Sequence, residues 1–107
     1  MDYDKLASDL NAANVAAKLA ADKTDDGGSA NLDSAFLRLP RARESKVLEA
    51  IRTAGLYCRE KCRWIGEGYM ITPTVSGQGN KRTTAVEAFK RHMESCGWDV
   101  LIYYQVD

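Results

Sequence analysis

The sequence predicts an α+β protein in which an N-terminal helix precedes a ferredoxin-like βαββαβ domain with a four-stranded antiparallel sheet. Three observations lead to this prediction. Apolar residues recur at helical spacing over residues 3–22. From residue 32 onward, strand and helix patterns follow one another in the order strand, helix, strand, strand, helix, strand. The length of 107 residues fits one domain with a single core.

The N-terminal helix is predicted from a narrow, alanine-rich apolar stripe. Leu10 and Ala17 share one helical face, and alanine is the best helix former. We expect an acidic helix at residues 1–23 that packs on its own domain or contacts another subunit. Glycine and aspartate then predict a linker at residues 24–31, which leaves residues 32–107 for the ferredoxin-like domain.

The first half of the ferredoxin-like domain is bounded by a proline and a glycine. Alternation of apolar residues predicts a strand at residues 33–39. Pro40 ends that strand and is expected to open a helix, because its missing N–H needs no partner at a helix start. Gly55 ends the helix, and residues 56–65 are predicted to form one long strand.

The second half begins with a turn at residues 66–68 that leads into a strand at residues 69–72. A polar loop follows, and the second helix of the domain is predicted to begin with a capping box at residues 84–87. Gly97 is expected to end this helix. The last strand is predicted at residues 98–106, which are rich in β-branched and aromatic side chains.

One face of the predicted sheet carries no helix, because alternate residues of a strand lie on opposite faces. Aromatic and basic side chains on such a face bind single-stranded nucleic acid by stacking and by charge. The alternative is that the N-terminal helix or a second subunit covers this face. The residues predicted to bind through it are Phe36, Arg38, Tyr57, Arg59, Arg63 and Tyr103.

The loop at residues 76–84 predicts an anion site. Two glycines allow close backbone approach, Lys81 and Arg82 supply positive charge, and the next helix begins with free N–H groups. A Walker A motif is missing, and the alternative is a solvated surface loop. Replacement of Arg82 by alanine is expected to weaken nucleotide binding and to leave folding stability nearly unchanged. The predicted phosphate contacts are Asn80, Lys81, Arg82 and Thr83.

A second basic helix start, at Arg41 and Arg43, is predicted to add to ligand binding. In the predicted topology the strands that precede the two helices are antiparallel. The two helix starts therefore lie at opposite ends of one subunit, and they can share a ligand only across a boundary between subunits.

Metal binding and catalysis are not predicted. Cys58, Cys62, His92 and Cys96 would make a Cys3His zinc set, but an extended strand places Cys58 and Cys62 about 13 Å apart. The three cysteines are therefore expected in the core. The sequence places no nucleophile or orienting group beside the single histidine. We therefore expect a protein that does not catalyse a reaction and that needs no cofactor.

Charge and composition restrict the partners and the compartment. Residues 1–31 carry six acids and three lysines, whereas residues 32–107 carry nine acids and twelve bases. The excess of three positive charges attracts anions, but it is far smaller than in duplex-binding proteins. The sequence shows no apolar run of the ~20 residues that a membrane helix needs, no signal-peptide pattern, and an odd number of cysteines. We therefore expect a cytoplasmic protein with reduced thiols.

Three stretches, at residues 26–33, 77–83 and 103–107, resemble stretches of small phage and prophage proteins. They are similar to anti-defence proteins that sequester cyclic ADP-ribose-type signals. The resemblance implies an oligomer, a dimer or higher, that traps a nucleotide in the host-cell cytoplasm without cleaving it, and it assigns no binding residue.

The leading prediction is thus a non-enzymatic homo-oligomer that sequesters a small phosphorylated nucleotide. The first alternative is an inhibitor that binds a protein of a host defence complex through the sheet face or the acidic helix. The second alternative is a single-stranded nucleic-acid binder that uses the sheet face.

Overall fold

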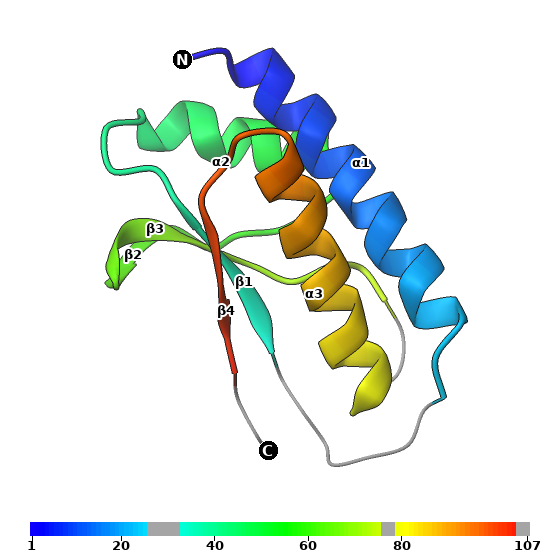
Figure 1. Ribbon diagram of the computed structural model, residues 1–107. Helices are drawn as coiled ribbons and strands as arrows, with labels where there is room; N and C mark the ends of the chain where they lie inside the picture. The colour runs from blue at the N-terminus through cyan, green and yellow to red at the C-terminus, as the bar shows by residue number, and fades with distance from the viewer. Residues whose placement is uncertain (26–32, 76–78, 105–107) are drawn as a thin grey trace.

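The computed structural model of the protein describes residues 1–25, 33–75 and 79–104. The four strands form one antiparallel sheet in the order β2-β3-β1-β4. Figure 1 shows α1 and α3 side by side, on one side of β1 and β4. The prediction of an α+β fold with an N-terminal helix and a four-stranded antiparallel sheet is confirmed. In chain order the elements are α1 (Tyr3–Asp22), β1 (Ser34–Arg38), α2 (Glu44–Thr53), β2 (Lys61–Trp64), β3 (Gly66–Ile71), α3 (Asn80–Ser95) and β4 (Val100–Tyr103).

The predicted N-terminal helix is confirmed as α1, because a capped start and an apolar stripe agree. Asp2 accepts a hydrogen bond from the backbone N–H of Lys5 at 3.0 Å, which satisfies one free donor of the helix start. Leu6 and Leu10 are fully buried, and burial of one such side chain stabilises a fold by about 1.5–3 kcal/mol. Ala17, also fully buried, has a side chain small enough to let α1 lie close to α3.

Polar contacts fix α1 to the rest of the chain. The buried side chain of Asn14 donates to Thr74 Oγ1 at 2.9 Å and accepts from the Thr74 N–H at 3.0 Å. Trp98 Nε1 donates to the Asp9 carboxylate at 2.8 Å. The apolar residues of α1 therefore belong to the same core as those of the sheet.

The core lies between the helices and one face of the sheet, called the core face below. Leu37 of β1 is opposite Tyr69 of β3 and Val100 of β4, and all three are fully buried. They pack in one cluster with Ile51 of α2 and Phe89 of α3. The opposite face of the sheet is called the outer face.

The predicted strand at residues 56–65 is wrong in its first half, because β2 covers only Lys61–Trp64. Gly55, with a φ of 81°, ends α2, and Leu56 donates its N–H to the Ile51 carbonyl at 3.0 Å. This is the Schellman arrangement, in which the residue after the glycine packs back on the helix. Leu56 is buried in the core, so it does not continue the pairing with β3.

Two further element starts differ from the prediction. β3 begins at Gly66, whose φ of 81° lets the hairpin turn close without the predicted three-residue turn. α2 begins at Glu44 and not at Pro40, which lies in a turn. The N–H of Arg43 donates to the Tyr3 hydroxyl at 3.0 Å, so a contact with α1 helps to set where α2 starts.

The capping box predicted for the second helix of the domain is also wrong. α3 begins at Asn80, four residues earlier, with Gly79 at the N-cap position. The N–H of Thr83 donates to the Gly79 carbonyl at 3.1 Å, so the predicted cap residues already lie inside the helix. Side-chain contacts of the first turn, described below, hold this early start.

The end of α3 confirms the prediction that Gly97 stops the helix. Gly97 has a φ of 94°, and the N–H of Trp98 donates to the Met93 carbonyl at 3.0 Å. This second Schellman arrangement turns Trp98 toward the helix, so β4 begins later than predicted and covers Val100–Tyr103. The end of the predicted strand, at residues 105–106, lies outside the described residues.

Candidate functional site

Strand register assigns eight side chains to the outer face. Phe36 of β1 is opposite Met70 and Leu101, and Cys62 of β2 is opposite Gly68. Paired residues of neighbouring strands point to the same face. The outer face therefore carries Ser34, Phe36, Arg38, Cys62, Trp64, Met70, Leu101 and Tyr103.

Three aromatic rings form a cluster on the outer face. The Trp64 ring lies 5.3 Å from the Phe36 ring and 5.0 Å from the Tyr103 ring, edge-on to both. The opposite charges of ring edge and ring face favour this arrangement. Trp64 and Tyr103 belong to opposite edge strands, so the Trp64 side chain reaches across the sheet and Phe36 below it is fully buried.

Gly68 makes room for the aromatic cluster. A Cβ atom at this position would lie 2.6 Å from Phe36 Cζ and 2.6 Å from the carbonyl oxygen of Leu37. Carbon atoms in contact are normally about 3.5–4.0 Å apart. A side chain at position 68 would therefore displace the Phe36 ring or the backbone of β1.

Exposed apolar residues include Trp64 of the cluster and the residues that follow Trp64 and Tyr103 in the chain. Trp64 is 40% exposed, Ile65 next to it is 48% exposed, and Tyr104 at the end of β4 is 67% exposed. Among the eight residues of the outer face, the one charged side chain is Arg38, and it forms an ion pair with Asp99 at 2.8 Å. The outer face is thus apolar, aromatic and poor in free charge.

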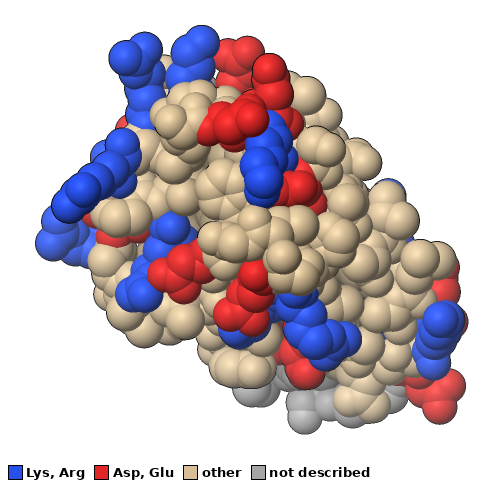
Figure 2. Space-filling model, turned by 45° about the horizontal axis from the view of Figure 1, so that its top comes forward, with Lys and Arg blue, Asp and Glu red and all other residues tan. Residues whose placement is uncertain are grey.

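Charged side chains elsewhere form no single-sign surface in the view of Figure 2. Basic and acidic groups are interspersed, with Lys and Arg most prominent on the side of the β2–β3 hairpin and the loop before α2. This distribution agrees with a net charge of zero. It differs from the continuous basic stripe of duplex-binding proteins.

The structure brings together only part of the predicted sheet-face set. Phe36, Arg38 and Tyr103 lie on the outer face, but the buried Phe36 ring presents no surface to stack on a base. The prediction that Arg63 lies on the outer face is wrong. Its register partner is Glu67, on the side of the core face, and the two form an ion pair at 3.7 Å.

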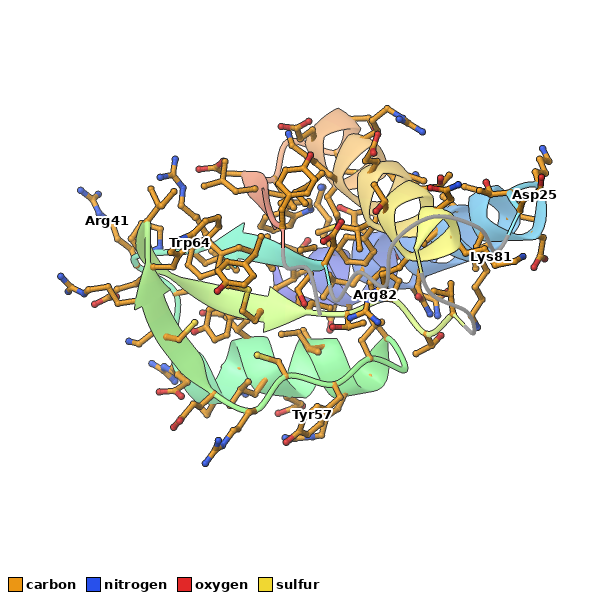
Figure 3. All side chains as sticks on the ribbon, turned by 90° about the horizontal axis from the view of Figure 1, so that it is seen from below. Asp25, Arg41, Tyr57, Trp64, Lys81 and Arg82 are labelled. Carbon is orange, nitrogen blue, oxygen red and sulfur yellow. The ribbon has the colours of Figure 1, made fainter. Side chains whose placement is uncertain are left out.

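Two other members of that set lie outside the sheet. Tyr57 and Arg59 precede β2, and Figure 3 shows Tyr57 pointing away from the sheet. The irregular path of residues 56–60 reverses the alternation that the sequence predicts for β2. Trp64 therefore lies on the outer face, and sequence reasoning missed it although a tryptophan in a predicted strand was a signal.

A hollow of about 530 Å³ opens between residues 55–60 and β3. It exists because the pairing of β2 with β3 ends at Lys61 and Tyr69, after which the two chain segments separate. Cys62 and Met70 of the outer face line it, together with residues of the irregular segment.

The predicted phosphate contacts at the start of α3 make intramolecular contacts. Lys81 Nζ donates to the Ala21 carbonyl at 2.9 Å, and Arg82 Nε donates to the Asp33 carbonyl at 2.7 Å. The Thr83 hydroxyl donates to the Asp33 carboxylate at 3.0 Å. Burial lowers the pKa of the Arg82 guanidinium, and the Asp33 carboxylate acts in the opposite direction. These contacts tie α3 to the end of α1 and the start of β1.

The other predicted ligand contacts are exposed and scattered. Asn80 is exposed at the first position of α3, and residues 76–78 of the predicted anion loop lie outside the described residues. Arg41 and Arg43 are exposed before α2. Figure 3 shows Arg41 and Lys81 at opposite ends of the molecule, which confirms the predicted separation of the two helix starts.

Burial raises the pKa of two acidic side chains. It raises the pKa of the Cys58 thiol to about 11, with a further rise from the Cys62 thiolate, and the pKa of Tyr69 to about 12, with a further rise from Glu44. Both groups are protonated at neutral pH and are poor nucleophiles. The Tyr69 hydroxyl is buried and has no hydrogen-bond partner among the described residues.

Comparison of the chain with protein-family models, curated proteins and solved structures finds no match. The resemblance to phage anti-defence proteins therefore stays an expectation. Within the described ranges, no group of three or more His, Cys, Asp and Glu side chains is placed to hold a metal ion. No helix in the same ranges has the length and apolar character to cross a membrane.

Proposed function

We propose that the protein is a non-catalytic binding module that recognises a protein partner through the outer face of its sheet. The exposed ring of Trp64 in a packed aromatic cluster on the outer face, with the exposed Ile65 next to it in the chain, carries this proposal. Aromatic residues are enriched, and charged residues depleted, at the centres of protein interfaces. Trp64 is the expected centre of the contact, because its ring is already held by two neighbours and loses little freedom on binding.

The charge distribution favours a protein partner over a nucleic acid. A nucleic acid requires lysine or arginine side chains to neutralise its phosphates. On the outer face Arg38 is paired with Asp99, and Arg63 lies with Glu67 on the other side of the sheet. Stacking on Trp64 and Tyr103 would therefore lack the accompanying charge.

Sequestration of a small phosphorylated nucleotide at the start of α3 stays a prediction. Lys81 and Arg82 would have to exchange their hydrogen bonds to Ala21 and Asp33 for bonds to the phosphate, which reduces the net gain. Titration calorimetry with cyclic and linear nucleotides tests this function. Saturable binding that is lost in Arg82→Ala would favour sequestration over protein recognition.

We further propose a finer fold assignment and a compartment. The element order βαββαβ after α1 and the strand order β2-β3-β1-β4 support a ferredoxin-like arrangement. The free thiols of Cys58, Cys62 and Cys96 support a reducing compartment such as the cytoplasm.

Site-specific photo-crosslinking tests the protein-binding proposal. A photoreactive amino acid replaces the exposed Ile65 in the full chain, which is expressed in its native cell. A matched variant carries it at Val15 of α1, which is 50% exposed. We expect a discrete protein adduct from position 65 and none from position 15. An adduct with twice the mass of the chain would identify the partner as a second copy.

Two outcomes of this experiment count against the proposal. Position 65 can give no adduct, or only adducts with nucleic acid, and either result overturns recognition of a protein by the outer face. An adduct from Val15 alone would move the contact to α1 and favour the alternative in which the acidic helix binds the partner.

A further inference from the structure

Three sulfur atoms line the hollow between residues 55–60 and β3. Cys58 and Cys62 contribute thiols, and Met70 contributes a thioether. Both cysteines are free. None of the three side chains belongs to the aromatic cluster, so the hollow offers a chemistry that protein recognition by Trp64 does not use.

Cys62 and Met70 are neighbours on adjacent strands of the outer face. Cys62 is directly opposite Gly68, and Met70 is two residues further along β3. Such diagonal neighbours are about 7–8 Å apart, within reach of long side chains. The flexible thioether of Met70 can therefore approach the Cys62 thiol.

Cys58 joins this pair because residues 56–60 do not continue β2. Its thiol donates to the Glu60 carbonyl at 3.5 Å, a local contact that an extended strand does not make. Cys58 lines the hollow together with Cys62 and Met70, and it also packs against the core cluster. The separation of about 13 Å was predicted for one continuous extended strand, and residues 56–60 do not continue β2.

Two thiols and a thioether match the preferences of a soft metal ion. Thiolate and thioether ligands select Cu(I), whereas Mg²⁺ and Ca²⁺ prefer oxygen. A structural zinc site takes four nitrogen, sulfur or oxygen ligands, and the described residues place no group of three or more His, Cys, Asp and Glu side chains together. Met70 is the third ligand at this hollow. Its thioether suits Cu(I) and is not among the usual ligands of zinc.

We propose that Cys58, Cys62 and Met70 form a three-coordinate site for Cu(I), in which each thiol releases its proton to solvent as its sulfur binds the ion. The bound ion would link the irregular segment at residues 55–60 to β3, where the backbone pairing has ended. Since this ligand set exists in the folded state, bound Cu(I) raises the unfolding temperature. The site does not depend on the proposed protein recognition.

Competition for Cu(I) under anaerobic, reducing conditions tests the site. The full chain is titrated with Cu(I) in the presence of the chromophoric chelator bicinchoninate. We expect the chain to withdraw one equivalent, and Cys58→Ser and Cys62→Ser each to lose this uptake. Met70→Leu should retain weaker uptake. The matched control is Cys96→Ser, a cysteine at the end of α3 that does not line the hollow, and it should bind as the unaltered chain does.

X-ray absorption at the copper edge and circular dichroism complete the test. Three sulfur neighbours are expected around copper, and two in Met70→Leu. Circular dichroism of each metal-free variant separates loss of a ligand from loss of the fold. If Cys58→Ser does not fold, the copper uptake of Cys62→Ser tests the site, because Cys62 does not pack against the core cluster. Undiminished uptake in Cys62→Ser, loss of uptake in Cys96→Ser, or tighter binding of zinc than of Cu(I) would each overturn the proposal.

Discussion

Leu37 and Phe36 are neighbours in β1, both are fully buried, and they lie on opposite faces of the sheet. Leu37 is buried by a cluster to which three helices and three strands contribute. Phe36 is covered by Trp64 and has room only because position 68 is a glycine. Equal burial of two side chains can therefore depend on many partners or on a few.

This difference separates the role of the two faces. The core face is held by many contacts and determines the fold. The packing of the outer face, by contrast, depends on one side chain, Trp64 of the edge strand β2. Regions with fewer buried contacts open at a lower free-energy cost. The outer face is thus the face on which the packing can adjust to a partner.

The largest effect is expected from Leu37→Ala on the core face. Loss of the buried side chain and the cavity left behind should lower the free energy of unfolding by about 2–5 kcal/mol. Urea denaturation measures the change. Leu19→Ala on α1, where the side chain is 57% exposed, is the control and should change stability by less than about 0.5 kcal/mol. Similar losses for both variants would contradict the core as described.

The dependence of the outer face on Gly68 predicts the next largest effect. Gly68→Ala introduces a methyl group against Phe36 and the Leu37 carbonyl, and such overpacking costs about 1–3 kcal/mol. If the Phe36 ring is the main obstacle, Gly68→Ala should cost less in a Phe36→Leu background, as a double-mutant cycle would measure. Strictly additive losses would show that the carbonyl oxygen is the obstacle instead.

Arg82→Ala tests whether a predicted ligand contact belongs to the packing of the core side. Arg82 is half-buried and donates to the Asp33 carbonyl, so its loss should destabilise the fold by about 1–2 kcal/mol, the scale of a charged hydrogen bond. The sequence alone predicts nearly no change. Arg91→Ala, exposed on the same helix, is the matched control in thermal and urea unfolding. Equal stability of both variants would show that Arg82 contributes no more to folding than an exposed arginine does.

The smallest expected effect concerns Asp9, which holds Trp98 on the core side. Hydrogen bonds from Lys5 and from Trp98 lower the pKa of Asp9, against the opposing effect of burial. A lowered pKa contributes stability that is complete above the ordinary value of 3.8, and this stability is lost as the pH falls through the folded-state pKa. The stability difference between the unaltered chain and Asp9→Asn should therefore be constant from about pH 7 to pH 5 and shrink below about pH 4.

Unfolding curves at several pH values measure this difference. A stability gap that stays the same down to pH 2 would mean that the Asp9 charge contributes nothing and that the gap comes from contacts that do not depend on charge and are lost in Asp9→Asn. The ion pair of Arg38 with Asp99 on the outer face is a useful reference, since that aspartate side chain is 51% exposed. Asp99→Asn should change stability little at any pH, as exposed ion pairs contribute little.

Much of the fold was predictable because its signals are local. The alanine-rich stripe predicts α1, and Gly55 and Gly97 predict where α2 and α3 end. Each of these features involves residues within one or two helical turns. The alternation in β1 likewise predicts that Leu37 faces the core.

The candidate site was predictable only in part. Tyr103 and Arg38 were placed on the outer face, but Trp64 was missed. The alternation predicted from Leu56 does not survive the irregular segment before β2, since Leu56 follows the Schellman cap of α2 into the core. A periodicity argument fails wherever a helix end turns the next residue away from the sheet.

By itself, the sequence determined the order and type of the elements, because these follow from spacing and turn chemistry among near neighbours. Only the tertiary structure decided what Lys81 and Arg82 do. Their partners Ala21 and Asp33 are 60 and 49 residues away in the chain, and no local pattern reveals them. The same holds for the Trp64 ring between Phe36 and Tyr103, since three strands have to come together before the rings can meet.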